Sequence, residues 1–218
     1  MPEPLAISVY SDVVCPWCYV GKRWLEAALA SPGSPKDVRV SWRPFELNPD
    51  LPAEGIERAV YRAHKFGAAA SAALDAKMAK TGHELGITFA FERMARTPNT
   101  RLAHRLIWEA ERQRRQSELV ERLFAGYFER GLDVGTRHVL ESLAAEAGLE
   151  RSGVARALDD PESLAAVVDL ELEGLRLGVA AVPFFILPGS FGVSGAQPPE
   201  FWREALAQIG AAAVPIGL

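Results

Sequence analysis

Two cysteines, Cys15 and Cys18, are separated by a proline and a tryptophan, and they are the only cysteines in the 218 residues. An alternating apolar run at residues 5–10 precedes them, and an amphipathic run at residues 20–29 follows. A C-x-x-C pair between a strand and a helix is typical of a redox-active dithiol. The alternatives are two buried apolar side chains, or half of a zinc site that lacks paired histidine or cysteine partners. We therefore expect thiol–disulfide chemistry and no metal.

Only a thiolate attacks a disulfide, and an ordinary cysteine with a pKa of about 8.5 supplies little thiolate at neutral pH. The unpaired N–H groups and the positive dipole end at a helix start favour negative charge on Cys15. We therefore expect Cys15 to be the nucleophile and Cys18, one turn later, to resolve the mixed disulfide. Pro16 suits a first helical turn. Trp17 is uncharged, so we expect a pair less oxidising than the most oxidising of its kind.

The segments around the motif predict a strand, a helix to about residue 30, and a second strand at residues 38–42. This spacing is a βαβ unit, in which the two strands are parallel. Asp12 precedes the motif and has two interpretations. Its carboxylate caps the turn or the first helical N–H groups, or it accepts the proton of Cys18 during resolution.

A long segment with almost no strand pattern follows. It predicts helices that are separated by glycine and proline signals and that show apolar stripes at helical spacing. The sheet then resumes with a strand at residues 180–187, a hairpin to residue 194, a closing helix at residues 199–209 and a loosely held tail at residues 211–218. We expect one domain from residues 1–54 and 179–218, and an inserted helical domain at residues 55–178. The expected helices of the insertion are residues 56–85, 97–111, 116–130, 136–147, 151–158 and 161–177.

The composition sets limits on partners and location. The net charge of −4 offers no electrostatic footprint for nucleic acid. No apolar run approaches a membrane span, and the first residues lack the pattern of a signal peptide. We therefore expect a cytoplasmic protein without membrane or nucleic-acid partners. Because the cytosol keeps thiols reduced, reduction, isomerisation or a stress response is a better expectation there than disulfide formation.

Four sequence blocks resemble the FrnE-like branch of the DsbA family, and the resemblance runs nearly end to end in the same order. It implies an α/β fold: a thioredoxin-like, mixed four-stranded sheet with a large helical insertion, and a thiol-disulfide oxidoreductase activity. Related 2-hydroxychromene-2-carboxylate isomerases and kappa-class glutathione transferases typically carry serine at the position of Cys15. The blocks are residues 11–22 (SDVVCPWCYVGK), 42–49 (WRPFELNP), 182–186 (VPFFI) and 192–198 (GVSGAQP).

The resemblance also assigns expectations to single residues. It implies that Pro183 packs against Cys15 after a cis peptide bond, and that Val182 offers backbone groups to an extended substrate peptide. It places four further residues near the cleft, which are Phe45, Asn48, Asn99 and His104. From the residues alone, Phe45 is a core aromatic, Asn48 a turn residue, Asn99 a helix cap and His104 a polar face residue, and both interpretations stay open.

These features predict a dithiol oxidoreductase that acts on thiol- or disulfide-containing proteins or peptides, as a monomer or a homodimer. It needs no organic cofactor, because the cysteine pair carries the electrons, but a cellular thiol or reductase must recycle it. Glutathione is a possible co-substrate. One alternative is a glutathione-dependent isomerase or transferase of small aromatic substrates, which does not need Cys18. Another is a holdase-like protein whose apolar groove matters more than its cysteines.

Overall fold

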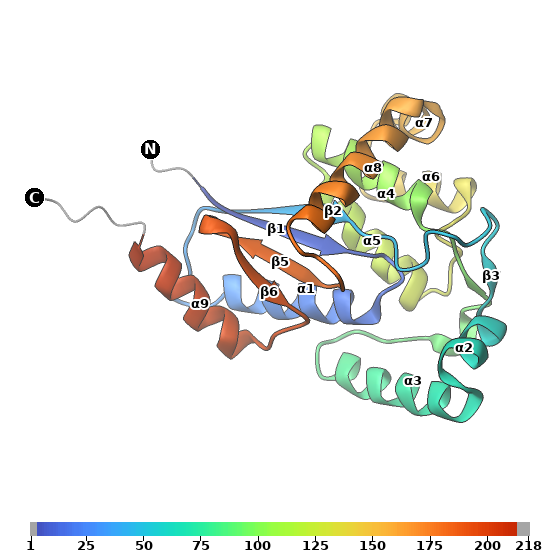
Figure 1. Cartoon of the computed structure of the whole chain (residues 1–218), viewed down its shortest axis with the longest axis horizontal. Helices are drawn as coiled ribbons and strands as arrows, with labels where there is room; N and C mark the ends of the chain where they lie inside the picture. The colour runs from blue at the N-terminus through green and yellow to red at the C-terminus, as the bar shows by residue number, and fades with distance from the viewer. Residues whose placement is uncertain (1–3, 213–218) are drawn as a thin grey trace, which may run out of the picture.

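In a computed structural model of the chain, residues 4–212 are described. A four-stranded sheet has the order β2-β1-β5-β6 (Figure 1). Strand β1 (Leu5–Ser11) and strand β2 (Val38–Pro44) are parallel, and helix α1 (Pro16–Leu29) connects them. Strands β5 (Phe184–Leu187) and β6 (Phe191–Ser194) form an antiparallel hairpin, and β5 is antiparallel to β1. The predicted α/β class, the parallel βαβ unit and the mixed four-stranded sheet are thus confirmed.

Alternation along the strands determines which helices cover each face of the sheet. Val9 is paired with Trp42 on one side and Phe185 on the other, so these three side chains share a face. The Trp42 ring lies 6.3 Å from the ring of Phe124 in the insertion. The Phe185 ring lies 4.6 Å from the ring of Trp202 in helix α9 (Pro199–Ala212). Helix α8 (Pro161–Arg176) covers Tyr10 on the opposite face, where a Cβ at Gly174 would lie 2.5 Å from the tyrosine ring.

The insertion is helical, as predicted, but its boundaries differ in places. The single helix expected at residues 56–85 is two helices, because Gly67 adopts a φ of 77° that breaks the first one. Two-residue strands β3 (Ile56–Glu57) and β4 (Arg96–Thr97) pair across the insertion and were not predicted. The remaining helices are α2 (Arg58–Phe66), α3 (Ala68–His83), α4 (Arg101–Arg112), α5 (Gln116–Phe128), α6 (Arg137–Glu146) and α7 (Arg151–Asp159).

Local signals explain the helix ends that were predicted correctly. The Asp160 carboxylate accepts a hydrogen bond from the backbone N–H of Glu162, so the expected cap of α8 is present.

Helix α9 extends to Ala212, three residues beyond the expected end, so the first two residues of the expected tail are helical. The rest of that tail lies outside the described residues. The expected two-domain division stays a prediction, and the insertion packs directly on the sheet through contacts of α4, α5 and α8 with β2.

Candidate active site

Cys15 and Cys18 lie at the start of α1, where the chain turns out of β1. Cys15 is the residue that caps the helix, with an extended backbone, and its carbonyl accepts the backbone N–H of Cys18 at 3.0 Å. Both thiols are free, and Cys15 is 6% exposed whereas Cys18 is 1% exposed. This order of exposure suits an attacking thiol that meets substrate and a resolving thiol that meets only its neighbour. The first turn contains no acidic residue that would oppose a thiolate.

Burial raises the pKa of the Cys18 thiol well above its ordinary value, and the neighbouring Cys15 sulfur adds to this effect. At neutral pH Cys18 is therefore a protonated thiol. It must lose its proton before it can attack a disulfide, because the thiol itself is not a nucleophile. The resolving step thus needs a proton acceptor close to the start of α1.

The loop before β5 lies against Cys15. The Val182–Pro183 peptide bond is cis, as the sequence resemblance predicts. The Cys15 thiol donates a weak hydrogen bond to the Val182 carbonyl, with 3.7 Å between sulfur and oxygen. Gly21 permits this packing, because a Cβ there would lie only 3.2 Å from the Pro183 ring. A substrate sulfur joined to Cys15 would therefore lie beside the backbone of residues 182–183.

Asp12 is completely buried beneath the motif. Its carbonyl accepts the backbone N–H of Cys15 at 3.0 Å, and its carboxylate Oδ2 accepts that of Leu47 at 2.8 Å. The other oxygen, Oδ1, faces Nε2 of His104 at 3.5 Å, which is longer than a hydrogen bond. Among the described residues, Asp12 Oδ1 and both ring nitrogens of His104 have no hydrogen-bond partner. The carboxylate therefore caps neither the turn nor the first N–H groups of α1, because its hydrogen bond goes to the remote Leu47, and the expected capping role is wrong.

His104 is 2% exposed and lies behind Asp12, and the wall of the neighbouring pocket does not include it. Burial by itself would lower its pKa, but Asp12 next to it, together with Glu46 and Glu171, reverses the direction and raises it. The buried imidazole therefore keeps its proton to a higher pH than an ordinary histidine.

Two acidic residues and one arginine complete this group, which we call the acidic cluster (Asp12, Glu46, Arg101, His104 and Glu171). Arg101 donates two hydrogen bonds to the Glu46 carboxylate, at 2.8 and 3.0 Å. Glu171 accepts the backbone N–H of Glu46 at 2.9 Å. Burial raises the pKa of Glu171, and the Glu46 charge adds to this. Sequence reasoning missed Glu46, Arg101 and Glu171, which come from three distant segments of the chain; Glu46 lies in the block at residues 42–49, but its role was not expected.

The other residues expected near the cleft take different positions. Asn99 joins the start of α4 to a loop: its Oδ1 accepts the backbone N–H of Arg101 at 3.0 Å, and its Nδ2 donates to the carbonyl of Leu51 at 2.8 Å. Asn48 lines the pocket described next and accepts a hydrogen bond from the Tyr61 hydroxyl at 2.7 Å. Phe45 is half-buried and lies outside the wall of that pocket.

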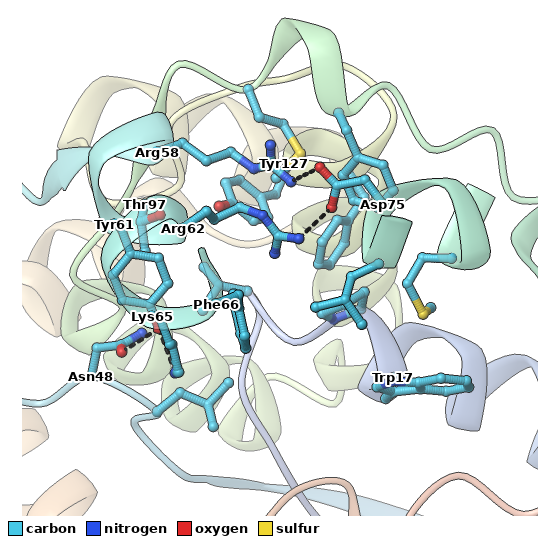
Figure 2. Close-up of a pocket in the computed structure, with 18 of the residues that line it drawn as sticks. Trp17, Asn48, Arg58, Tyr61, Arg62, Lys65, Phe66, Asp75, Thr97 and Tyr127 are labelled. Carbon is cyan, nitrogen blue, oxygen red and sulfur yellow. Dashed lines mark hydrogen bonds and ion pairs between the residues drawn. The ribbon is translucent and has the colours of Figure 1, made fainter. Parts of the chain in front are cut away.

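A pocket of about 330 Å³ opens beside the motif (Figure 2). Pro16 and Trp17 form part of its wall, and Trp17 is 37% exposed. The opposite wall is helix α2, with basic side chains that point into the space (Figure 2). Apolar residues complete it, namely Val14, Leu47, Phe66, Leu74, Met78, Phe91, Met94 and Phe128. Sequence reasoning did not find this pocket, because its walls come from five separate parts of the chain.

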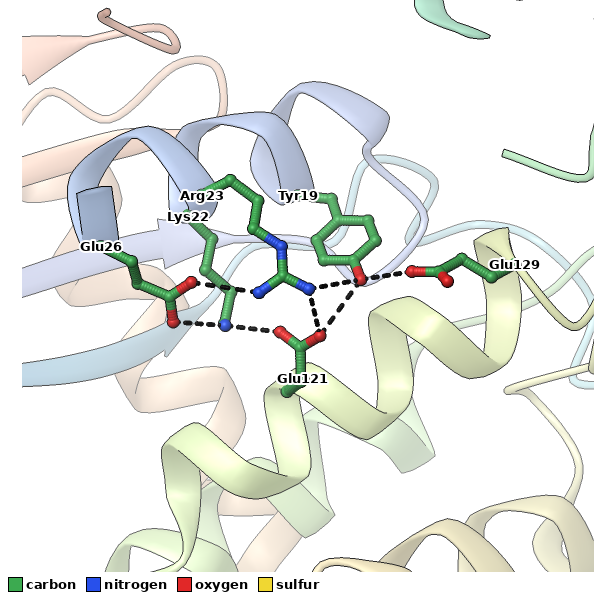
Figure 3. Close-up of polar contacts among 6 residues, drawn as sticks. All are labelled: Tyr19, Lys22, Arg23, Glu26, Glu121 and Glu129. Carbon is green, nitrogen blue, oxygen red and sulfur yellow. Dashed lines mark hydrogen bonds and ion pairs between the residues drawn. The ribbon is translucent and has the colours of Figure 1, made fainter. Parts of the chain in front are cut away.

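A second polar group, which we call the helix network, joins α1 to α5 (Figure 3). It consists of Tyr19, Lys22, Arg23, Glu26, Glu121 and Glu129. Lys22 is 4% exposed and donates hydrogen bonds of 2.6 Å to both Glu26 and Glu121. The Tyr19 hydroxyl donates to Glu129 at 2.6 Å, and burial together with this bond raises its pKa. Since Tyr19 follows Cys18 directly, the network holds the active-site helix against the insertion.

Residues 4–212 contain neither a candidate metal-binding cluster nor a candidate membrane-spanning helix. Within that range, no group of three or more His, Cys, Asp or Glu side chains could hold a metal ion. Nor does any described helix combine the length and the apolar character needed to cross a membrane.

The sheet order, the paired cysteines at a helix start and the adjacent cis-proline define a thioredoxin-fold protein of the thiol oxidoreductase class. A family model for a DSBA-like thioredoxin domain matches residues 6–207. The chain therefore belongs to the DsbA-like thioredoxin-domain family.

Individual relatives agree with this assignment. The Bacillus subtilis protein YwbO is 28% identical over 205 residues, which cover 92% of this chain and 94% of that protein. The crystal structure of a probable DsbA oxidoreductase from Streptomyces coelicolor has a TM-score of 0.87 at 32% identity and covers 98% of this chain and 93% of its own. The cytosolic disulfide reductase DsbM from Pseudomonas aeruginosa, solved with GSH, has a TM-score of 0.65 at 20% identity, covering 95% and 100% of the two chains. DsbM shares the fold.

Proposed function

We propose that this protein exchanges thiols and disulfides with peptides or proteins through the Cys15–Cys18 pair. The observation that supports the proposal most directly is the position of the pair. Cys15 caps α1 and faces the cis-proline loop, while Cys18 is closed off behind it. A thiol that is 6% exposed beside one that is 1% exposed suits a mixed disulfide that forms at Cys15 and is resolved from within.

In the reducing direction, the Cys15 thiolate attacks one sulfur of a substrate disulfide. A bond forms between Cys15 and that sulfur, and the other substrate sulfur leaves as a thiolate that takes a proton from water. Cys18 then loses its proton and attacks the Cys15 sulfur. The Cys15–Cys18 disulfide forms, the second substrate thiolate leaves, and the two electrons have passed from the dithiol to the substrate.

Asp12 is the residue that we propose as the proton acceptor for Cys18. The raised pKa of the Cys18 thiol creates the need for a base. The Asp12 carboxylate lies under the same turn and has an oxygen without a partner among the described residues. His104 faces that oxygen. We propose that His104 orients the Asp12 carboxylate and keeps it negatively charged, and that it does not contact the substrate.

We propose that the protein works as a reductase or isomerase in the cytoplasm, with no metal or organic cofactor. The oxidised pair must then be returned to the dithiol by a cellular thiol or a reductase. Glutathione is a reasonable co-substrate, because DsbM, which has the same fold, is a cytosolic disulfide reductase that was solved with GSH.

The test is dithiol-dependent reduction of insulin by the wild type, Cys15→Ser and Cys18→Ser, with free thiols counted before and after oxidation. We expect two thiols to interconvert with one disulfide in the wild type, and both variants to lose catalytic turnover. Cys18→Ser should still trap a mixed disulfide with substrate, whereas Cys15→Ser should not. Turnover that survives in either variant would overturn the proposed mechanism.

The pocket beside the motif favours a second candidate, a glutathione-dependent isomerase or transferase of small aromatic substrates. A volume of about 330 Å³ and an apolar lining suit a small aromatic molecule. That chemistry uses one sulfur site and does not need Cys18. Glutathione-dependent turnover of such a substrate that survives Cys18→Ser, in a protein that does not reduce insulin, would favour this candidate over the first.

A further inference from the structure

The pocket beside the motif has an electrostatic character that the redox chemistry does not require. Four of the described residues that line it are basic (Arg58, Arg62, Lys65 and Lys77), and one is acidic (Asp75). The whole chain carries a net charge of −4. Positive charge is therefore concentrated at this place against the overall balance of the molecule. A cluster of one sign in a concave, partly apolar site attracts ligands of the opposite sign.

The single carboxylate in the pocket is shared between two guanidinium groups. Asp75 Oδ2 pairs with Arg58 at 2.7 Å, and Asp75 Oδ1 pairs with Arg62 at 2.8 Å. Both arginine side chains are at most 16% exposed. Burial lowers the pKa of Arg62, and the nearby Arg58 charge acts in the same direction against the pull of Asp75. One acid for two partly buried cations leaves positive charge uncompensated on the side of α2 that lines the pocket.

Lys65 adds a third cation whose closest partners are neutral. Its ammonium group donates to the hydroxyl of Tyr61 and lies 5.1 Å from the centre of the Tyr61 ring and 5.7 Å from that of Phe66. Figure 2 shows Lys65 and Phe66 on the side of the pocket across from Trp17. A ligand that reaches from the motif into the pocket would therefore meet an apolar surface first and an ammonium group beyond it.

The rim of the pocket is apolar and open to solvent. Trp17, Phe66 and Leu74 are 37%, 40% and 41% exposed, although large apolar side chains are usually buried. Trp17 belongs to the C-x-x-C motif itself, and Val14 and Pro16, which flank Cys15 in the sequence, also line the pocket, so a group that covers this rim lies beside the turn that carries the reacting cysteine. The position of the pocket therefore links recognition of a neighbouring group to the chemistry at Cys15.

We infer that this pocket selects disulfide substrates that carry an apolar group and a carboxylate close to the reacting sulfur. The apolar group packs between Trp17 and Phe66, and the carboxylate pairs with Lys65 and Arg62. The inference rests on the proposed function, since it names the substrate preference of the same dithiol. An acidic peptide segment and a small aryl carboxylic acid both have this chemistry, and the experiment distinguishes them.

The probes are 2-pyridyl disulfides of four short peptides that differ only beside the cysteine: phenylalanine with glutamate, phenylalanine with glutamine, alanine with glutamate, and alanine with glutamine. Cys15 attacks the peptide sulfur, 2-thiopyridone leaves, and its release gives the second-order rate constant. We expect the phenylalanine–glutamate peptide to react about tenfold faster than its glutamine counterpart at low salt. The preference should shrink as salt is added, because the pocket is open to screening ions.

Lys65→Met removes the charge but keeps the length of the side chain. We expect it to slow the two glutamate peptides toward their glutamine counterparts and to leave the glutamine peptides unchanged. Phe66→Ala should instead reduce the preference for phenylalanine over alanine. The control is Lys80→Met, which removes an exposed lysine of α3 outside the pocket and should leave all four rates as in the wild type.

A fifth probe, the pyridyl disulfide of 2-mercapto-3-phenylpropanoate, is compared with its amide to separate the two sources. If the acid reacts faster than its amide by a similar factor, the pocket also accepts small acids. If only the peptides show the preference for a carboxylate, the pocket serves protein substrates. Equal rates for all four peptides, or a glutamate preference that persists in Lys65→Met, would overturn the inference while leaving the dithiol chemistry intact. If no probe releases thiopyridone, the proposed function fails instead.

Discussion

Two buried polar groups flank the active-site helix, and they differ in how completely their members are paired. In the helix network, Lys22 contacts two carboxylates and the Tyr19 hydroxyl contacts Glu129. In the acidic cluster, one oxygen of Asp12 and both ring nitrogens of His104 lack hydrogen-bond partners among the described residues. Asp12 of the acidic cluster lies three residues before Cys15, and Tyr19 of the helix network follows Cys18 directly, so both groups are next to the dithiol in the sequence.

The difference separates a structural role from a chemical one. A buried polar atom without a partner costs about 1–3 kcal/mol, so a group kept only for stability should be fully hydrogen-bonded. The helix network meets this condition and fixes α1 to α5. The acidic cluster does not meet it, and its Asp12 belongs to the turn that carries a thiol that must release a proton. We therefore expect changes in the helix network to alter stability, and changes in the acidic cluster to alter rates and pH dependence.

The largest expected effect is that of Asp12→Asn on the resolving step. Asparagine keeps the shape and can still accept the N–H of Leu47, but it cannot take the proton of Cys18. We expect the decay of the mixed disulfide to slow about 100-fold, as for the loss of a general base, with little change in its formation. Stopped-flow measurement of the two phases tests this.

The matched control for that variant is Asp169→Asn, which makes the same change at an exposed position of α8. Both phases should match the wild type in the control. If Asp12→Asn slows the formation and the decay of the mixed disulfide equally, Asp12 positions the motif and does not accept the proton.

The next effect belongs to the helix network. Lys22→Met removes one of the two cations that Glu26 and Glu121 share, the other being Arg23. Breaking a buried ion pair typically costs 3–5 kcal/mol. Because Arg23 still pairs with Glu121, we expect the free energy of unfolding to fall by about 2 kcal/mol in urea denaturation. Lys80→Met should change it by less than about 0.5 kcal/mol. The folded Lys22→Met protein should resolve its mixed disulfide at the wild-type rate. A much slower resolution would contradict the division into one structural and one chemical group.

Tyr19→Phe should have a smaller effect on the same network. The ring keeps its stacking on Phe124 at 5.0 Å. The hydroxyl is lost, and with it the bonds to Glu129 at 2.6 Å, to Glu121 at 3.1 Å and from Arg23 at 3.0 Å. We expect the free energy of unfolding to fall by about 1 kcal/mol. A double-mutant cycle with Glu129→Gln measures the coupling directly, and additive effects of the two changes would show that the bond contributes nothing.

The smallest expected effect is a change in how stability depends on pH. His104 has a raised pKa in the folded protein, whereas in the unfolded chain its pKa is about 6.5. The folded protein thus holds the proton more tightly. The resulting stability is fully present below a pH of about 6.5 and is lost as the pH rises through the folded pKa. The unfolding free energy of the wild type minus that of His104→Gln should therefore decrease as the pH rises above about 6.5. A difference that does not vary with pH would show that folding leaves the pKa of His104 unchanged.

Much of the fold follows from local patterns in the sequence. The alternating run of β1, the amphipathic run of α1 and the strand at Val38 predict the parallel βαβ unit, and the proline and glycine signals predict the hairpin of β5 and β6. The break at Gly67 was missed because one glycine inside a helical pattern is often tolerated. The β3–β4 pair was missed because two residues on each side, far apart in the chain, carry no periodicity.

The sequence by itself determined the dithiol, the turn that places it at a helix start, and the order of strands and helices around it, because each of these depends on residues within a few positions of one another. Only the tertiary structure decided that His104 lies behind Asp12, that Glu46, Arg101 and Glu171 join them, and that α2 brings a set of cations to the side of Trp17. Those placements depend on how the insertion packs against the sheet, and burial and distance between remote segments leave no pattern in a single sequence.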